Sequence, residues 1–136
     1  ITGNIYGKRS AKYIMLKLDM ILHGHTTKLE MPDTISIEHI LPQNPADDSQ
    51  WCRDFTENER TDWCNKLGNL TLISRRKNSI QSNRDYDIKK ERYFKGNIEL
   101  FSNSIRVYQL YPTWVVADVE KNQNYVTQLI CNTFGI

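Results

Sequence analysis

Apolar residues recur with a helical period near the start of the chain. The apolar positions of this segment are Tyr13, Ile14, Leu18, Ile21 and Leu22. Lys12, Lys17 and Asp19 fall off this face, as expected of an amphipathic helix. Gly24 is placed to end it. The pattern therefore predicts a helix over roughly residues 10–22.

A strand-like alternation follows at 35–39, Ile-Ser-Ile-Glu-His. Alternating apolar residues are typical of a half-buried strand. The strand must end by Pro42, because proline has no N–H to donate to a ladder. A second apolar run covers 70–73, after Gly68 as a turn residue. The two runs predict an antiparallel hairpin near 35–40 and 69–73.

Helical signals flank this hairpin. Ser74 is a suitable N-cap for a helix over 75–83, and the pattern restarts near Asp85 and runs towards Lys95. The polar stretch 43–66 is long for a bare loop, so it predicts a short internal helix. We expect helices to pack on the hairpin, because two strands alone are only marginally stable.

The C-terminal part also shows a helical pattern. Thr113, directly after Pro112, is a candidate cap, and apolar residues recur helically from Val115 to Phe134. We found no repeat, low-complexity tract or linker in the chain. These features predict an α+β fold.

Size and composition set outer bounds. A chain of 136 residues with 39% hydrophobic and 25% charged residues fits one soluble globular domain. No apolar run is long enough to span a bilayer, so we expect a cytoplasmic protein without a membrane partner. Cys52, Cys64 and Cys131 form no CxxC pair, which favours reduced thiols over a structural zinc site. The first residue is Ile1 rather than Met, which suggests a C-terminal fragment of a larger protein.

The formal net charge of +2 conceals an uneven distribution. Residues 44–62 contain six acids against two bases, whereas residues 74–95 contain eight bases against three acids. A basic segment is where a phosphate backbone would lie. Such runs are also common on solvated helix faces. The adjoining motif makes nucleic-acid contact the better interpretation.

Three short segments carry the candidate chemistry: 37–43 (Ile-Glu-His-Ile-Leu-Pro-Gln), 67–72 (Leu-Gly-Asn-Leu-Thr-Leu) and the pair Lys77-Asn78. A neutral histidine such as His39 can take a proton from water. A divalent ion can carry the charge that develops on a phosphodiester. Neighbouring residues of a regular strand point to opposite faces. Glu38 and His39 can therefore share a site only where the strand ends.

Each of these residues has an ordinary structural explanation when taken alone. His39 could be a satisfied structural histidine and Glu38 the polar face of a strand. Asn69 could be a turn residue, and Asn78 a helix-surface residue or local cap. Their order and spacing within a strand–strand–helix context favour a functional site.

The segment 37–83 resembles the core of an HNH (ββα-metal, His-Me finger) nuclease. The nine-residue interval from Asn69 to Asn78 resembles the HNH domain of RNA-guided CRISPR nucleases. The fuller pattern is most similar to the C-terminal domain of GmrSD-type, modification-dependent restriction endonucleases. That similarity rests on His-Ile-Leu-Pro at 39–42, the 67–72 motif, Asn78, Asn83 and the Lys-rich helix that follows. Tyr13 and Trp114 would match the flanking helices of that family.

The resemblance implies one HNH-like nuclease domain over 1–136, with flanking helices around a ββα-metal core. Its expected parts are an N-terminal helix (1–30), the core (31–95, with an insertion at 43–66) and a C-terminal helical part (96–136). Two positions depart from the family pattern. Glu38 stands where HNH proteins usually have Asp, and Trp63-Cys64 stands where relatives often have a His.

The resemblance also implies roles for individual residues. His39 would be the general base, Asn69 would hold the loop that orients it, and Asn83 would assist. Glu38 and Asn78 would bind Mg²⁺ or Mn²⁺, and Asn78 would complete the catalytic set. The expected nucleic-acid-binding residues are Arg75, Arg76, Lys77, Arg84 and Lys89.

The implied function is metal-dependent cleavage of DNA in a restriction-modification or antiviral defence system. Upstream recognition or nucleotide-hydrolysing domains would supply specificity, and double-strand cleavage would need two sites, as in a dimer. Two alternatives stay open. One is a catalytically inactive nucleic-acid-binding domain of the same fold. The other is a regulatory or interaction domain that uses Trp51, Trp63 and Trp114 as contact surfaces.

Overall fold

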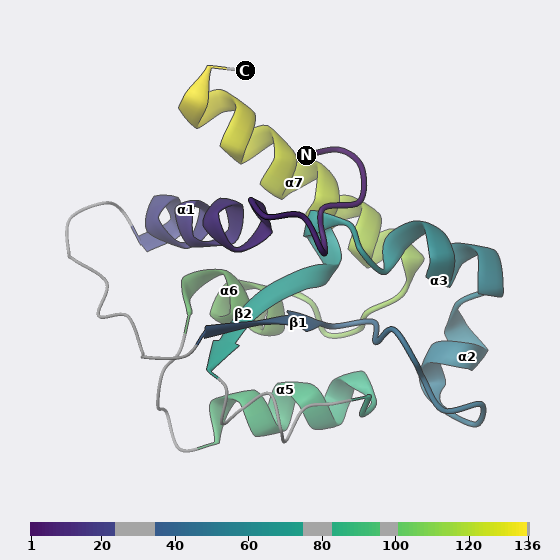
Figure 1. The fold of residues 1–136 in the computed structure, drawn as a ribbon. Helices are drawn as coiled ribbons and strands as arrows, with labels where there is room; N and C mark the ends of the chain where they lie inside the picture. Colours follow the sequence, from purple (N-terminus) through teal and green to yellow (C-terminus); the bar gives the residue numbers. More distant parts are fainter. Residues whose placement is uncertain (24–34, 75–82, 96–100, 136) are drawn as a thin grey trace.

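The two strands predicted from the sequence pair with each other in the computed structural model, which describes residues 1–23, 35–74, 83–95 and 101–135 (Figure 1). In these residues the elements are α1 (Ala11–His23), β1 (Ile35–His39), α2 (Gln50–Asp54), α3 (Glu57–Trp63), η1 (Leu67–Asn69), β2 (Leu70–Ser74), α5 (Tyr86–Phe94), α6 (Ser102–Leu110) and α7 (Val116–Phe134). The α+β class is therefore confirmed.

Strands β1 and β2 form a two-stranded antiparallel sheet. Ile35 pairs with Ser74 at one end, and His39 pairs with Leu70 at the other. The predicted hairpin is confirmed to within about a residue at each end, the usual uncertainty of a boundary. The pairing places the end of β1 beside the start of β2, and this junction positions the site.

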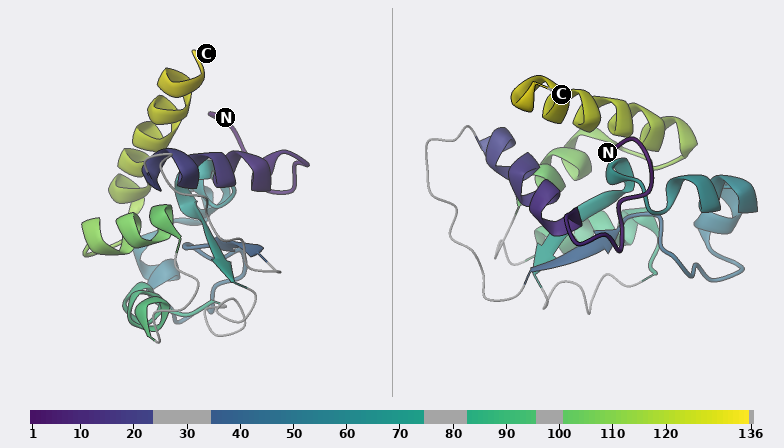
Figure 2. Two further views of the ribbon diagram at one scale, coloured as in Figure 1. Left: turned by 90° about the vertical axis from the view of Figure 1, so that its left-hand side faces the viewer. Right: turned by 45° about the horizontal axis from the view of Figure 1, so that its top comes forward.

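Helices cover both faces of the sheet, with α1 on one side and α5 on the other (Figures 1 and 2). Leu70 and Leu72 of β2 belong to the apolar cluster that contains Met15 of α1. Ile73, on the opposite face, belongs to the cluster that contains Tyr93 of α5. The period-two alternation of side chains along a strand thus divides the core into two.

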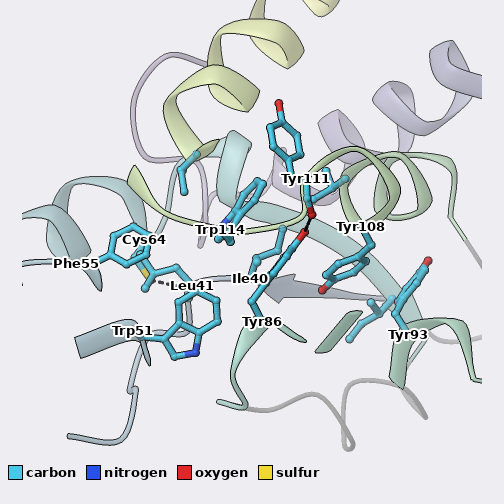
Figure 3. Packing of buried hydrophobic residues seen from close by; sticks show 13 residues of the cluster. Ile40, Leu41, Trp51, Phe55, Cys64, Tyr86, Tyr93, Tyr108, Tyr111 and Trp114 are labelled. Carbon is cyan, nitrogen blue, oxygen red and sulfur yellow. Dashed lines mark hydrogen bonds between the residues drawn. The ribbon is translucent and has the colours of Figure 1, made fainter. Parts of the chain in front are cut away.

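The core on the α5 side is largely aromatic (Figure 3). Tyr86 stacks on Trp114 with ring centroids 5.9 Å apart, and its hydroxyl donates to the carbonyl of Tyr111 at 2.8 Å. Trp51 and Trp114 are both fully buried, whereas Trp63 is half-buried. The interpretation of the three tryptophans as contact surfaces is therefore wrong for Trp51 and Trp114, which build the core.

Helix α1 is confirmed, but its inner face differs from the predicted one. The buried positions are Ala11, Met15, Leu18 and Asp19, while Tyr13 is 62% exposed. Asp19 was placed off the apolar face. It is buried because it accepts hydrogen bonds from the backbone N–H groups of Ser102 and Asn103 at the start of α6. Burying a carboxylate requires such partners.

The sequence pattern did not reveal α6. Its N-cap residue is Phe101, whose side chain accepts no hydrogen bond, and the cap is supplied instead by Asp19 from α1. A capping group on another helix leaves no local signal for this start. Ser104 donates from the same helix to the carbonyl of Leu72 at 2.7 Å, which ties α6 to β2.

The insertion at 43–66 contains two short helices, α2 and α3, where one was predicted. Thr56 and Glu59 form a reciprocal capping box at the start of α3.

The last helix, α7, is confirmed, but Thr113 is not its cap. Asp118 accepts from the Val115 N–H at 2.9 Å, and the Thr113 hydroxyl only donates to the same carboxylate.

Gly68 lies in η1 against α7. A Cβ at this position would lie 2.6 Å from the Gln123 Cα, so a side chain would collide with the helix backbone. The prediction of a turn residue described only part of its role. The Gly68 N–H donates to Gln123 Oε1, and its carbonyl accepts from Asn122 Nδ2 at 2.7 Å.

The helix predicted over 75–83 falls almost wholly outside the described residues, so the third element of a ββα core is not described. The predicted restart near Asp85 is confirmed as α5.

Cys52, Cys64 and Cys131 are free thiols, as expected. In the ranges that the structure describes, no helix is long and apolar enough to cross a membrane.

Candidate active site

His39 lies at the end of β1, at the edge of a surface cleft with a volume of about 360 Å³. The cleft is lined by Tyr6, Ile37, Glu38, His39, Pro42, Gln43, Asn44 and Asn83. Glu38 and His39 are neighbours in β1, and both are among the residues that line this cleft.

The imidazole of His39 is held on two sides. Its Nε2 lies 2.9 Å from the side-chain oxygen of Asn65. An amide oxygen only accepts, so this contact assigns the proton to Nε2 and leaves the lone pair on Nδ1. The ring of Tyr6 contacts it edge-on, with centroids 4.2 Å apart and planes at 66°. The ring therefore has a defined orientation and tautomer.

The environment favours the neutral form of this ring. Burial lowers the pKa of His39 from its ordinary value, the Asn65 hydrogen bond acts in the opposite direction, and the positive charge of Lys89 lowers it further. A neutral imidazole keeps a lone pair that can accept a proton at neutral pH. His39 therefore has the protonation state that a general base needs.

Glu38 is 4% exposed and forms an ion pair with the fully buried Lys89 of α5. The ammonium donates to Glu38 Oε1 at 2.6 Å and to the backbone carbonyl of His39 at 2.6 Å. Burial raises the pKa of Glu38 and lowers the pKa of Lys89, while their mutual attraction acts the opposite way on each. The attraction between the partners therefore offsets part of the cost of burying the two charges, and burial has the larger effect on both pKa values.

This placement corrects the expected role of Lys89. A fully buried ammonium does not reach a phosphate backbone, so Lys89 is not a surface contact for DNA. Tyr86, Lys89 and Tyr93 are the buried residues of α5, at the spacing of one helix face. Two large aromatics at that spacing were the signal that Lys89 lies inside. Arg84, in contrast, is exposed.

Asn69 is fully buried and uses its side-chain amide four times. Its oxygen accepts from the Leu41 N–H at 2.8 Å and from Trp114 Nε1 at 3.0 Å. Its nitrogen donates to the carbonyls of Leu41 and Cys64, each at 2.9 Å. The two bonds to Leu41 hold the loop two residues after His39.

The other candidate residues are placed unequally. Asn83 lines the cleft and donates to the carbonyl of Asn44 at 3.3 Å. Asn78 and the basic group 75–77 lie outside the described residues. The structure thus brings Glu38, His39 and Asn83 to one cleft, with Asn69 behind the loop.

Sequence reasoning missed Asn65 and Tyr6. The carbonyl of Asn65 accepts from the N–H groups of Ile5 at 2.9 Å and Tyr6 at 3.2 Å, so one residue anchors both the N-terminal segment and the His39 ring. Asn65 stands two residues before the 67–72 motif, which was a local signal. Tyr6 has no such signal, because only the fold brings it to His39.

The donor set decides what kind of metal ion the cleft could hold. Among the residues that the structure describes, no group of three or more His, Cys, Asp or Glu side chains could hold one. The oxygen-bearing residues that line the cleft include Glu38, one carboxylate oxygen of which is bonded to Lys89, and Asn44 and Asn83. A site with only a few protein oxygens is sufficient for a hard ion such as Mg²⁺, because this ion keeps several of its waters and also binds the substrate phosphate.

The model of the family described as GmrSD restriction endonucleases, C-terminal domain, matches residues 2–129. No curated protein and no solved structure gives a significant match. The family match spans every helix and strand of the described fold up to the last turns of α7.

Proposed function

The chain belongs to the family of GmrSD restriction endonuclease C-terminal domains, and from this premise we propose that it is a metal-dependent, HNH-type endonuclease that hydrolyses DNA phosphodiester bonds. The family gives a nuclease role related to restriction. The observation that carries the more specific proposal is the His39 imidazole, held by Asn65 in a cleft with its pKa lowered.

Hydrolysis needs a nucleophile stronger than neutral water. In the proposed reaction, Nδ1 of His39 takes a proton from water. Nε2 keeps its own proton, which is hydrogen-bonded to the side-chain oxygen of Asn65. The new oxygen–phosphorus bond forms as the bond to the 3′ oxygen breaks, and the leaving 3′ oxygen takes a proton from solvent water, which gives 5′-phosphate and 3′-hydroxyl ends. Asn65 keeps the ring oriented throughout, and the dipole of its side-chain amide stabilises the imidazolium that forms.

We assign the metal-binding role to Glu38, with Asn78 as a second proposed ligand. Mg²⁺ or Mn²⁺ would supply charge stabilisation at the scissile phosphate and the leaving oxygen. The ion pair with Lys89 leaves Glu38 one carboxylate oxygen for a ligand. A site with so few protein ligands binds weakly until the substrate phosphate completes it.

DNA is the proposed substrate and partner. Arg84 is exposed and directly follows the cleft residue Asn83, so it is suitably placed for a phosphate contact. We assign the same role to Arg75, Arg76 and Lys77. Such contacts position a strand without reading its bases. Sequence or modification specificity would then come from further domains of a cytoplasmic defence protein, and double-strand cleavage from two such sites.

A plasmid-nicking assay with Mg²⁺, Mn²⁺ or EDTA tests this function. His39→Ala should lower the cleavage rate by roughly 10²–10⁴-fold, the range for loss of a general base, while DNA binding is retained. His23→Ala is the matched control, because His23 is an exposed histidine at the end of α1. Its rate should equal that of the unsubstituted protein.

The pH dependence supplies a second readout. The rate should rise with pH through one ionisation that lies below the ordinary histidine value, because burial lowers the pKa of His39. DNA binding without cleavage under every metal condition would instead identify the inactive binding domain. Equal rates for His39→Ala and the unsubstituted protein would remove His39 from the mechanism.

A further inference from the structure

Lys89 joins helix α5 to Glu38 and His39, two of the β1 residues that line the candidate active site. Its side chain is fully buried, and its ammonium donates to Glu38 Oε1 and to the His39 carbonyl, both at 2.6 Å. A lysine that served only to neutralise Glu38 would need only the first bond. The second bond ends on the backbone of the proposed base.

The peptide group between His39 and Ile40 is held at both of its polar atoms. Its carbonyl oxygen accepts from Lys89 Nζ, and its N–H donates to the carbonyl of Asn69 at 3.0 Å. Beyond it, the Asn69 side chain binds both backbone groups of Leu41. The backbone that carries the imidazole is thus fixed from α5 on one side and from η1 on the other.

This geometry matters because β1 ends at His39. His39 is the last residue of the ladder, where it pairs with Leu70, so contacts outside the sheet add to the ladder in setting the position of the imidazole. Asn65 and Tyr6 orient the ring. In the described contacts, the hydrogen bond from the Lys89 ammonium fixes the direction of the His39 carbonyl.

We propose that Lys89 is a positioning residue for the general base: it acts through the His39 carbonyl to hold the imidazole where it can activate water. This inference rests on the proposed function. It also assigns Glu38 a second task, because its carboxylate holds the ammonium in place. A small displacement of a reacting group can cost on the order of 10²-fold in rate.

The first experiment uses the unsubstituted protein and needs no activity. With ¹⁵N and ¹³C labelling, NMR should show a through-hydrogen-bond coupling between Lys89 Nζ and the His39 carbonyl carbon, and slow exchange of the Lys89 ammonium protons. A rapidly exchanging Lys89 ammonium with no such coupling would overturn the proposal.

The second experiment compares Lys89→Met with Lys90→Met, which removes the same charge from the next, half-buried position of α5. In the folded Lys89→Met protein, single-turnover cleavage should fall by roughly 10²-fold with DNA affinity unchanged. The imidazole resonances of His39, identified by their loss in His39→Ala, should shift. Lys90→Met should leave both rate and resonances unaltered.

The two proposals fail in different ways. An unsubstituted protein that never cleaves DNA, but shows the Lys89–His39 coupling and shifted His39 resonances in Lys89→Met, would refute the nuclease and retain Lys89 only as the residue that positions the His39 imidazole. A folded Lys89→Met protein with normal rate and unshifted His39 resonances would refute the positioning role alone. If Lys89→Met does not fold, the coupling in the unsubstituted protein decides.

Discussion

The loop after His39 is held from two sides by different chemistry. On the side of η1 and α7 the contacts are neutral: Asn69 binds Leu41, Cys64 and Trp114 with four hydrogen bonds. On the side of α5 they are ionic, because the Lys89 ammonium binds Glu38 and the His39 carbonyl. We call these the amide clamp and the ionic clamp.

The two clamps differ in what burial costs. Asn69 carries no charge and has a partner for each side-chain hydrogen-bonding atom, so its burial is compensated locally. Glu38 and Lys89 compensate each other, and burial works against the charge on both. The comparison indicates that loss of one partner should lower the stability of the protein more in the ionic clamp than in the amide clamp. Only in the ionic clamp should a second substitution recover the lost stability.

The ionic clamp is expected to show the largest effect on stability. Lys89→Met leaves the buried Glu38 carboxylate unpaired, and breaking such a pair costs about 3–5 kcal/mol. Adding Glu38→Gln removes the stranded charge and should recover most of that loss. Urea unfolding of the single and double variants measures both.

Lys90→Met is the control for this prediction, and it should change the free energy of unfolding by less than about 0.5 kcal/mol. A double variant that is no more stable than Lys89→Met would show that charge burial is not the dominant cost, and the distinction between the two clamps would be lost.

The amide clamp is expected to show the next largest effect. Asn69→Ala should lower the free energy of unfolding by roughly 2–4 kcal/mol. Each buried group left unpaired costs about 1–3 kcal/mol, and water that enters the space left by the side chain offsets part of the total. The loss should hardly vary with pH, as no ionisable side chain is removed. Urea unfolding at several pH values tests this, with exposed Asn58→Ala as the control. A stability equal to that of the unsubstituted protein would mean that the loop is held without Asn69.

Asp19, which caps α6 from α1, should show the smallest effect. Asp19→Ala removes the acceptor for two backbone N–H groups and should cost about 0.5–2 kcal/mol in the free energy of unfolding, the range for a lost N-cap. Urea unfolding measures it, and exposed Asp62→Ala serves as the control. Equal losses for both variants would argue against the cap.

The same residue has a pH dependence of defined sign. Burial raises the pKa of Asp19 from 3.8 to about 6, so the folded protein holds this proton more tightly than the unfolded chain does. The stabilising contribution is complete below 3.8 and is lost as the pH rises through about 6. Asp19→Asn should abolish this decline, and Asp62→Asn should not. If the stability of Asp19→Asn and that of the unsubstituted protein vary in parallel with pH, the raised pKa of Asp19 would be contradicted.

Local patterns were sufficient for much of this protein. The alternation at 35–39, the apolar run at 70–73 and the helical periods of α1, α5 and α7 predicted those elements, because each depends on spacing between near neighbours. The resemblance to GmrSD C-terminal domains, which the family match confirms, also rests on short contiguous motifs. His39, Glu38 and Asn83 could thus be selected before any geometry was known.

Only the tertiary structure decided which side chains those residues meet. Lys89 was grouped with surface bases and is buried against Glu38, fifty-one positions earlier in the chain. Asn65 and Tyr6 contact His39 from segments that no periodicity connects to it. The start of α6 is capped by Asp19 of another helix. Charge and hydropathy describe each side chain by itself, whereas burial and hydrogen bonding depend on partners that folding brings together from distant parts of the chain.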